Sequence, residues 1–362
     1  KLTKLPSLDL YSYDSPLRAF KFKLLKEPID LYEWLSHLSG GFSEPYTFGE
    51  RMAVWGRKNY NRFDVVHDNQ TLAYGLIKLR DMGVPVVGTI HHPITMDKRI
   101  DIKHAETLSL KLLKWRWYSF LKMQIKVARQ LDPIIVVSEN TRKDVVKDFK
   151  IDPKKTRKVL HGIDHKTFEP IPSIKRKKNQ LITTASADVP LKGLIYLIRA
   201  YSDLLNDFPD LSLIVIGKLR DGPTSKELDK KGIKDKVKFI SDLTSRQIAE
   251  LYAESTIAVS PSVYEGFGFP AGEAMSCGIP LISTNGGSLP EVVGDSGIIV
   301  PHSNPGELQK AIKELLLSPE KRKEFGEKGR NRVLEKFTWK RAAKELVDVY
   351  REAISNADNR SR

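Results

Sequence analysis

The segment TIAVSPSVYEGFGFPAGEAMSCGIPLIS, residues 256–283, predicts a unit of a parallel α/β sheet. The apolar runs Thr256–Ser260 and Pro280–Ser283 predict strands, and Ala271–Cys277 predicts a helix between them. A strand–loop–helix–strand unit joins parallel strands, and ligands bind beyond the carboxyl ends of such strands. We therefore place the candidate site in the loop that follows Ser260.

This loop has the composition of an anion-binding turn. Gly266 and Gly268 let the backbone approach a ligand closely, and Pro270 suits the first turn of a helix. The amides of Phe267, Gly268 and Phe269 would then point at an anion, helped by the positive end of the helix dipole.

Three charged residues complete the candidate site. Glu265 precedes the turn and Glu273 lies about one turn inside the helix, and carboxylates accept hydrogen bonds from the paired hydroxyls of a ribose or hexose. Lys192, with Gly193, follows the predicted strand Leu181–Ala185 and would supply a cation for phosphate.

Further strands and helices alternate along the rest of the chain, which predicts two doubly wound α/β domains facing a central cleft. The Pro-rich and basic stretch 169–180 separates them, so we expect an N-terminal domain at 1–170 and a C-terminal domain at 171–337. A final helix occupies 338–362, with apolar residues at helical spacing over Trp339–Ile354. The other predicted strands are Leu2–Leu5, Phe63–Val66, Val84–Ile90, Pro133–Val137, Arg157–Leu160, Leu211–Ile216, Val237–Ile240 and Ile298–Val300, and the other predicted helices include Thr71–Met82, Thr107–Leu131, Leu194–Leu205 and Ser245–Tyr252.

Composition restricts the class of protein. The 362 residues carry a net charge of +15, which favours phosphate-rich partners: nucleic acid, an anionic membrane or small phosphorylated ligands. No apolar run approaches the roughly 20 residues of a membrane span. The single cysteine, Cys277, favours a reducing compartment and is most simply a small core residue.

The ordered motifs resemble those of a known family. Glu265 and Glu273 form a Glu-x7-Glu pattern, followed by Gly286-Gly287, Pro290-Glu291 and Gly297, and preceded by His161-Gly162-Ile163-Asp164. This set resembles the retaining glycosyltransferases of the GT-B superfamily that are grouped as family 4. The resemblance covers roughly residue 60 to the C-terminal helix and implies two Rossmann-like domains, the first on the acceptor side and the second binding a nucleotide sugar.

The resemblance also implies residue roles. Glu273 would bind the ribose, Glu265 and the amides of 267–269 would hold the donor sugar and diphosphate, and Lys192 would neutralise the departing diphosphate. His91, in Thr89-Ile90-His91-His92, would reach the transferring sugar. The expected catalytic residues are His91, Lys192 and Glu265, and the expected donor-binding residues are Lys192, Glu265, Gly266, Phe267, Gly268, Phe269 and Glu273.

The implied reaction moves a hexosyl group from a nucleotide-diphosphate sugar to an acceptor with retention of configuration. The acceptor class stays open among a sugar, a glycolipid and a small alcohol. The resemblance implies no bound metal and no cofactor besides the sugar nucleotide, and the chain has no tight His/Asp cluster of metal-ligand type.

Two departures from the family pattern affect these expectations. Ser186 stands where the family has an arginine, six residues before Lys192, so the diphosphate would rely on Lys192 or another basic residue. The chain starts at Lys1 and has no glycine before Gly40, so we expect the first strand–helix–strand unit of the N-terminal domain to be missing.

Helix 107–131 is a candidate membrane-facing element. Lys111, Lys114, Lys122, Lys126 and Arg129 fall on about a third of its circumference, beside aromatic residues. We expect a cytoplasmic protein, and a peripheral position on the inner face of a membrane stays open. No nucleic-acid partner is expected, because no recognition helix or RNA-binding signature is present.

Two alternative functions remain at this stage. One is another GT-B enzyme, such as a sugar phosphorylase or a sugar-nucleotide epimerase. The other is a basic membrane-binding or nucleic-acid-binding module without catalysis.

Overall fold

A computed structural model describes residues 2–185 and 189–361 of the chain. The chain divides into two compact units: unit 1 comprises Lys1–Val137, Thr141–Val159 and Glu345–Arg362, and unit 2 comprises Ser138–Asn140 and Leu160–Lys344. The sequence placed the domain boundaries after residues 170 and 337. In the structure the chain passes from unit 1 to unit 2 between Val159 and Leu160, and it returns to unit 1 between Lys344 and Glu345, inside the helix α15 (Trp339–Ser361).

Unit 1 is built on a four-stranded parallel sheet with the order β1-β2-β3-β4. Its strands are β1 (Val66–Asn69), β2 (Val86–Ile90), β3 (Ile134–Val136) and β4 (Thr156–Lys158). Its helices are α1 (Pro28–Leu38), α2 (Glu44–Arg57), α3 (Tyr74–Asp81), α4 (Thr95–Lys103), α5 (Leu108–Trp117), α6 (Leu121–Ala128) and most of α7 (Glu139–Phe149).

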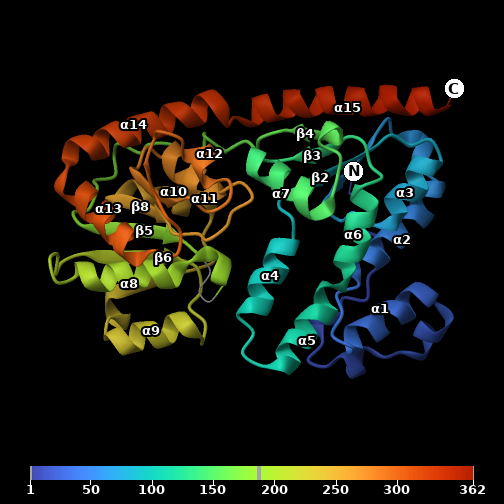
Figure 1. Cartoon of the computed structure of the whole chain (residues 1–362), viewed down its shortest axis with the longest axis horizontal. Helices are drawn as coiled ribbons and strands as arrows, with labels where there is room; N and C mark the ends of the chain where they lie inside the picture. The colour runs from blue at the N-terminus through green and yellow to red at the C-terminus, as the bar shows by residue number, and fades with distance from the viewer. Residues whose placement is uncertain (1, 186–188, 362) are drawn as a thin grey trace. The chain divides into compact units, whose positions relative to one another are not determined.

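Alternation along the strands divides the core of unit 1 between the two faces of its sheet. Ile90, Ile134 and Val136 pack against α3, α6 and α7 on one face. Val87 and Ile135 point to the other face, where Val349, Ala353 and partly buried Leu346 and Tyr350 of α15 cover them (Figure 1). The C-terminal helix therefore completes the core of unit 1.

Three sequence predictions in unit 1 need correction. The strand predicted at Phe63–Val66 lies instead at Val66–Asn69. Leu2–Leu5 forms no strand, and residues 3–7 instead line a cavity. The predicted helix Thr107–Leu131 is interrupted between α5 and α6 by a 3-10 turn, Tyr118–Phe120. The turn buries Tyr118 and Phe120 beside Phe42, so aromatic packing overrides regular helical spacing there.

Unit 2 is built on a six-stranded parallel sheet with the order β10-β9-β8-β5-β6-β7. Its strands are β5 (Gln180–Thr184), β6 (Ser212–Ile216), β7 (Val237–Ile240), β8 (Ile257–Ser260), β9 (Leu281–Thr284) and β10 (Ile298–Val300). Its helices are α8 (Leu194–Leu204), α9 (Pro223–Lys231), α10 (Ser245–Glu254), α11 (Phe269–Ser276), α12 (Leu289–Val293), α13 (Pro305–Leu317) and α14 (Pro319–Lys336), followed by the start of α15.

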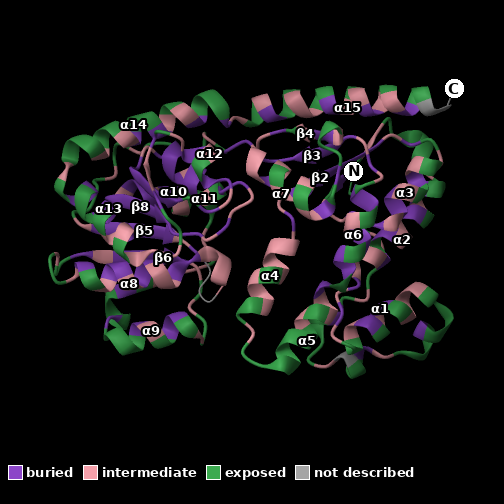
Figure 2. Cartoon of the chain, viewed as in Figure 1, coloured by how far each residue is buried: buried purple, intermediate pink, exposed green. Residues whose placement is uncertain are grey.

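Helices cover both faces of this sheet. Leucines and isoleucines of α8 and α13 pack on one face, and α10, α11 and α14 lie on the other. Figure 2 shows the strands as buried and the outer sides of α9, α13 and α14 as exposed. The fold prediction of two parallel-sheet α/β domains is confirmed.

The strand order of unit 2 reverses at its centre. From β5 the chain moves outward to β6 and β7, then returns to place β8 on the other side of β5. The loops that follow β5 and β8 therefore leave the sheet as neighbours at its carboxyl edge, where doubly wound sheets bind ligands.

Candidate functional site

The two neighbouring loops of unit 2 bring Lys192 and Glu265 together. Nζ of Lys192 lies 2.7 Å from Oε1 of Glu265, and the hydroxyl of Ser262 donates to the same oxygen at 2.8 Å. The Glu265 side chain is only 13% exposed, so the ion pair is partly desolvated. The sequence predicted both charged residues but missed Ser262.

Glycines make this close approach of loops possible. Gly193 has φ +62°, and a Cβ there would lie 2.1 Å from the carbonyl oxygen of Pro261. The amide of Val263 donates to the carbonyl of Leu191 at 2.7 Å, which ties the loop after β8 to the loop that carries Lys192. Lys192 is thus positioned by backbone contacts as well as by its ion pair.

The glycine pair Gly286-Gly287 lets the start of α12 approach the backbone of Glu265. The amide and hydroxyl of Ser288 both donate to the Glu265 carbonyl, at 2.9 and 3.0 Å. A Cβ on Gly287 would lie 2.2 Å from the same carbonyl oxygen. The Gly286-Gly287 motif therefore serves to bring the start of α12 against the backbone of Glu265.

The start of α11 has open amides. Gly268 caps the helix with φ 97° and supplies no side chain to bind them. Within the described residues, the N–H groups of Phe267, Gly268 and Phe269 donate no hydrogen bond. Together with the helix dipole, these donors suit a phosphate beside Lys192.

Glu273 lies inside α11 and is largely shielded from solvent. Desolvation by burial raises its pKa from 4.5 to about 7. A hydrogen-bond donor from a ligand would favour the charged form of such a carboxyl. Burial raises the pKa of the Cys277 thiol to about 12, and the charge of Glu273 contributes to this rise, so Cys277 is an unreactive core residue.

The turn His161-Gly162-Ile163-Asp164 packs against the beginning of α15. The Ile163 amide donates to the Phe337 carbonyl at 2.7 Å, and a Cβ on Gly162 would meet the Trp339 backbone at 2.5 Å. The His161 ring stacks on Phe269, with centroids 5.1 Å apart. This motif therefore supports the start of α11.

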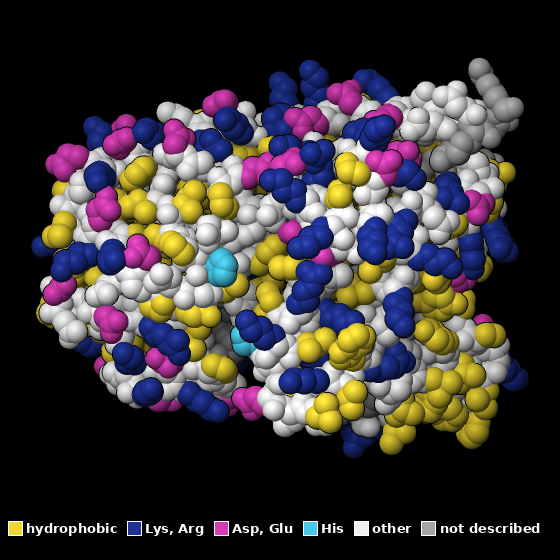
Figure 3. All heavy atoms as spheres, in the orientation of Figure 1, with side chains coloured by type: hydrophobic (Ala, Val, Ile, Leu, Met, Phe, Trp, Pro, Cys, Tyr) yellow, Lys and Arg dark blue, Asp and Glu magenta, His cyan; other side chains and the backbone are white. Residues whose placement is uncertain are grey.

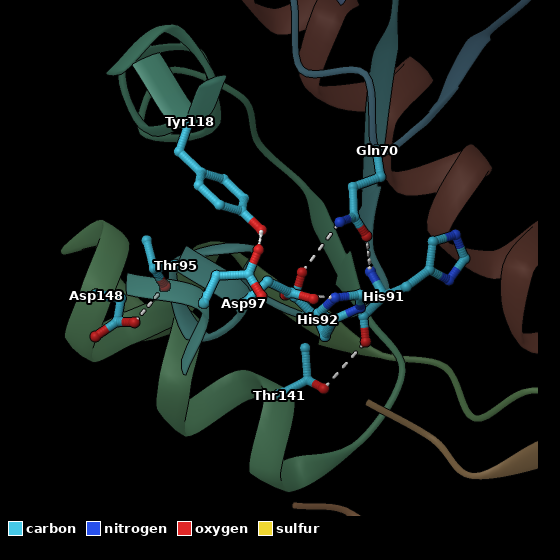
Figure 4. A network of polar contacts seen from close by, with 9 residues as sticks. Gln70, His91, His92, Thr95, Asp97, Tyr118, Thr141 and Asp148 are labelled. Atoms are coloured by element: carbon cyan, nitrogen blue, oxygen red, sulfur yellow. Dashed lines mark hydrogen bonds and ion pairs between the residues drawn. The ribbon is translucent and has the colours of Figure 1, made fainter. Parts of the chain in front are cut away.

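In unit 1, His91 follows β2 in a tight polar network (Figure 4). Its Nε2 lies 2.5 Å from Oδ1 of Asn69, and its backbone amide donates to Oε1 of Gln70 at 2.5 Å. Burial lowers the pKa of His91, and the neighbouring His92 and His67 lower it further. The imidazole is therefore neutral near pH 7 and suited to hydrogen bonding with uncharged hydroxyls.

The backbone after β1 is strained beside this histidine. Gln70 and Leu72 have φ values of 66° and 47°, in the left-handed region that such residues rarely adopt. The Asp68 carboxylate accepts from the Leu72 amide at 2.9 Å, and Gln124 donates to the Gln70 carbonyl at 3.0 Å. Strain of this kind at the carboxyl edge of a sheet is typical of ligand sites.

A cavity of about 600 Å³ opens next to this loop within unit 1. Its wall includes Glu33, which is 2% exposed and whose Oε2 lies 2.6 Å from Nη1 of Arg51. Arg51 also pairs with Asp30 at 2.6 Å. The other polar lining residues are Thr3, Lys4, Ser7, Glu44, Thr47, Asn69, Gln70, Thr71 and Gln124, and the aromatic ones are Phe42, Phe48 and Phe120.

Some of the basic residues predicted to line one face of helix 107–131 instead make contacts within unit 1. Lys114 pairs with Asp101 at 2.8 Å, and Arg129 donates to the Phe149 carbonyl at 2.6 Å. On α5 the exposed side chains include Leu108 and Trp115, and Figure 3 shows apolar side chains among lysines and arginines over this part of the chain. Contact with a membrane stays a prediction.

Three further expectations concern Ser186, a metal site and membrane-spanning helices. Ser186 lies outside the described residues. Across residues 2–185 and 189–361, no group of three or more His, Cys, Asp or Glu could hold a metal ion. None of the helices in the same ranges combines the length and apolar character that a bilayer crossing requires.

Comparisons with known proteins cover both units. The signature of the family Glycosyl transferases group 1 matches residues 166–332, and that of Glycosyltransferase Family 4 matches residues 14–167. The MMP alpha-(1->4)-mannosyltransferase of Mycolicibacterium hassiacum is 41% identical over 361 residues, which cover 98% of this chain and 86% of that protein. The D-inositol 3-phosphate glycosyltransferase of Streptomyces bingchenggensis is 28% identical over 325 residues, covering 84% of this chain and 70% of that protein.

Solved structures share the fold. Sucrose-phosphate synthase from Thermosynechococcus elongatus superimposes with a TM-score of 0.71 at 21% identity, covering 86% of this chain and 78% of that one. Anabaena HepE in complex with UDP gives a TM-score of 0.66 at 16% identity, covering 85% of this chain and 82% of that one. At these identities the likeness establishes the fold alone.

These matches do not favour the alternatives of a phosphorylase, an epimerase or a non-catalytic basic module. Two parallel-sheet units, the ordered glycine and glutamate motifs and a near full-length relative agree with one another. The chain therefore belongs to the group 1 glycosyltransferases and has the GT-B fold.

Proposed function

We propose that this chain transfers a mannosyl group from a nucleotide-diphosphate mannose to an uncharged saccharide, forming an α(1→4) linkage with retention of configuration. The observation that carries the nucleotide-sugar part is the Lys192–Glu265 pair at the carboxyl edge of the unit 2 sheet, beside the open amides of residues 267–269. The mannosyl group and the linkage follow the relative that is 41% identical over 98% of the chain.

In this proposal each donor-side residue acts on a different part of the sugar nucleotide. Glu273 accepts hydrogen bonds from the ribose hydroxyls, and the amides of Phe267, Gly268 and Phe269 receive the diphosphate. Lys192 exchanges its contact with Glu265 for one with the leaving diphosphate, and Glu265 is then released to hold hydroxyls of the mannose. Such preorganised donors stabilise the charge that develops as the bond to the diphosphate breaks.

The proposed reaction requires no protein nucleophile. The bond between C1 of mannose and the diphosphate oxygen breaks, and the acceptor hydroxyl forms the new bond to C1 on the same face. The hydroxyl proton passes to the departing diphosphate, so the products are a nucleoside diphosphate and an α-mannoside. We assign His91, neutral near pH 7, to a hydrogen bond with a hydroxyl of the transferring sugar.

The cavity beside Asn69 and Gln70 supports an uncharged acceptor. The described lining has two cations, Lys4 and Arg51, which balance the two carboxylates Glu33 and Glu44, and Arg51 is already paired with Asp30 and Glu33. The carboxylates of Glu33 and Glu44 accept from sugar hydroxyls but repel a phosphate. The exposed ring of Phe48 offers an apolar surface for the face of a sugar. The acceptor chemistry therefore differs from that of an inositol phosphate.

The test combines transfer assays with two variants. The chain is incubated with the mannose conjugates of GDP, UDP and ADP and with α-mannosides, and the product anomer is read by NMR. We expect Lys192→Ala to lower kcat by about 10²–10³-fold, as loss of one transition-state contact does. We expect Glu33→Gln to raise the acceptor KM while leaving nucleotide affinity unchanged, with Lys230→Ala, an exposed lysine of α9, as the unaffected control.

Clear results would contradict the proposal. A β-configured product would exclude retention from an α-linked donor, and transfer to an inositol phosphate in preference to a mannoside would exclude the uncharged acceptor. Absence of nucleotide binding to the folded chain would exclude the donor site itself.

A further inference from the structure

A second hollow lies at the opposite edge of the unit 2 sheet from the donor loops. It is a groove of about 760 Å³, and its wall includes Asn179, Thr256 and Gly278. These residues come immediately before β5, one position before β8 and shortly before β9, so the groove borders the amino ends of the strands. The four residues of β8 alone separate it from the donor loop by roughly 13 Å.

The groove is strongly basic. Its charged lining residues are Arg176, Lys177, Lys178, Arg322, Lys323, Arg330 and Glu327. Of the six cations, Lys177 forms an ion pair: its Nζ lies 2.6 Å from Oε2 of Glu254. Within the described residues the other five have no carboxylate partner within 4.0 Å. The run Lys175-Arg176-Lys177-Lys178, which the donor site does not use, supplies half of these cations.

The three arginines are held in place by backbone carbonyls, each through one terminal nitrogen. Nη2 of Arg176 donates to Gly278 at 2.8 Å, and Nη1 of Arg322 donates to Leu316 at 2.7 Å. Nη1 of Arg330 donates to the carbonyls of His165, Phe168 and Ser276 and to the Ser276 hydroxyl, at 2.9–3.0 Å. The remaining guanidinium nitrogens of Arg176, Arg322 and Arg330 make no hydrogen bond in the described part of the chain.

Anchoring of this kind has a structural value of its own, because it joins α14 to the loops beneath the sheet. It accounts for the three arginines, two of which donate to carbonyls at the ends of α13 and α11, but not for the exposed Lys178 and Lys323 that lie beside them. Desolvation lowers the pKa of Arg176, and the charge of Arg322 lowers it further. Six cations against the one lining carboxylate, Glu327, with the arginines held in place, form an arrangement by which proteins bind phosphate groups.

We propose that this groove is a binding site for a ligand carrying two or more phosphate groups, separate from the donor site. Arg176, Arg322 and Arg330 supply oriented donors, and Lys178 and Lys323 supply mobile charge at the rim. The volume far exceeds that of one phosphate, so a polyphosphorylated molecule fits better than a single anion. The ligand is either a free metabolite or the headgroup of a phosphoinositide, since both present the same chemistry.

The test uses inositol hexakisphosphate as the free probe and measures its binding by calorimetry. The informative variant is Lys178→Ala/Lys323→Ala, because both side chains are exposed and, among the described residues, neither forms an ion pair or hydrogen bond whose loss would leave a partner unsatisfied. The matched control is Lys226→Ala/Lys230→Ala on α9, which removes the same charge from another exposed surface of unit 2. We expect the first variant to weaken binding about tenfold or more and the control to change it less than about twofold.

A second arm distinguishes the source of the phosphate. The same proteins are sedimented with phosphatidylcholine vesicles with and without phosphatidylinositol bisphosphate. Loss of binding in Lys178→Ala/Lys323→Ala supports the groove as the binding site. The ligand is a free metabolite if the unmodified protein binds the soluble probe, and a lipid headgroup if it binds only the phosphoinositide vesicles. The proposal is overturned if the groove variant and the control behave alike, if neither probe binds, or if Lys192→Ala abolishes binding instead, because the donor loop would then be the site.

Discussion

Glu273 gives the most direct test of the donor site, because its environment makes a quantitative prediction. We consider Glu273→Gln, which keeps the size and hydrogen-bonding capacity of the side chain but removes its charge. Burial raises the pKa of Glu273 from 4.5 to about 7. The difference between these two pKa values means that ionisation of the carboxyl lowers the free energy of unfolding by about 3 kcal/mol.

The sign follows from proton binding. Between pH 4.5 and 7 the folded protein keeps the proton that the unfolded chain releases, so the stability of the wild-type protein falls as pH rises across this interval. The glutamine variant lacks this penalty. It should exceed the wild type in stability by less than about 1 kcal/mol at pH 5 and by about 3 kcal/mol at pH 8.

The assay is the melting temperature of both proteins between pH 5 and 8, with urea unfolding at the two ends of that range. Glu335→Gln, on the exposed side of α14, is the matched control and should follow the wild type at each pH. A constant difference between Glu273→Gln and the wild type across the range would refute the buried, proton-binding carboxyl. In the same variant nucleotide affinity should fall about tenfold or more, because charge-assisted hydrogen bonds to the ribose are lost.

Two further substitutions test how the units are built. Gly193→Ala places a Cβ 2.1 Å from the Pro261 carbonyl oxygen, so it should displace the Lys192 loop and weaken nucleotide-sugar binding at least tenfold. Gly232→Ala is the control for backbone strain, because Gly232 has a similar φ of +65° but a Cβ there would have nothing within 4 Å. Equal nucleotide-sugar binding by the two variants would refute the argument. Ala353→Asp buries a carboxylate in the contact between α15 and the unit 1 sheet, where Ala353 is 1% exposed. This substitution should lower the free energy of unfolding by about 3 kcal/mol or more and make α15 susceptible to limited proteolysis. Ser355→Asp, on the exposed side of α15, should have neither effect. Protection of α15 from proteolysis in both variants would contradict the packing described for it.

Local pattern located the strands of the second unit and the helix that carries its glutamate motif, but α13 and α14 were not predicted. The strands at Val237–Ile240 and Ile298–Val300 lie where apolar runs between turn residues predicted them, and α11 spans the segment after the glycine-rich turn. Buried parallel strands read as short continuous apolar runs, and helices covering them show a period of 3.6 residues, so both leave a trace in neighbouring residues. The charged residues of the donor loop were predicted for the same reason, since one short turn carries most of them.

The first unit was harder to predict. Helices α1 and α2 were missed, and Leu2–Leu5 was wrongly assigned to a strand. The buried polar residues Glu33 and Thr47 interrupt the apolar pattern of these helices. Their burial depends on partners such as Arg51 that become neighbours only after the chain folds.

The sequence by itself determined the fold class, the family and the short motif that carries Glu265 and Glu273, because these depend on residues close together along the chain. Only the tertiary structure decided which distant groups meet. Lys192 contacts Glu265 across 73 positions, α15 returns to cover Val87 and Ile135, and Arg176 joins Arg322 and Arg330 around one basic groove. Such contacts arise from strand order and helix packing, which no local pattern encodes.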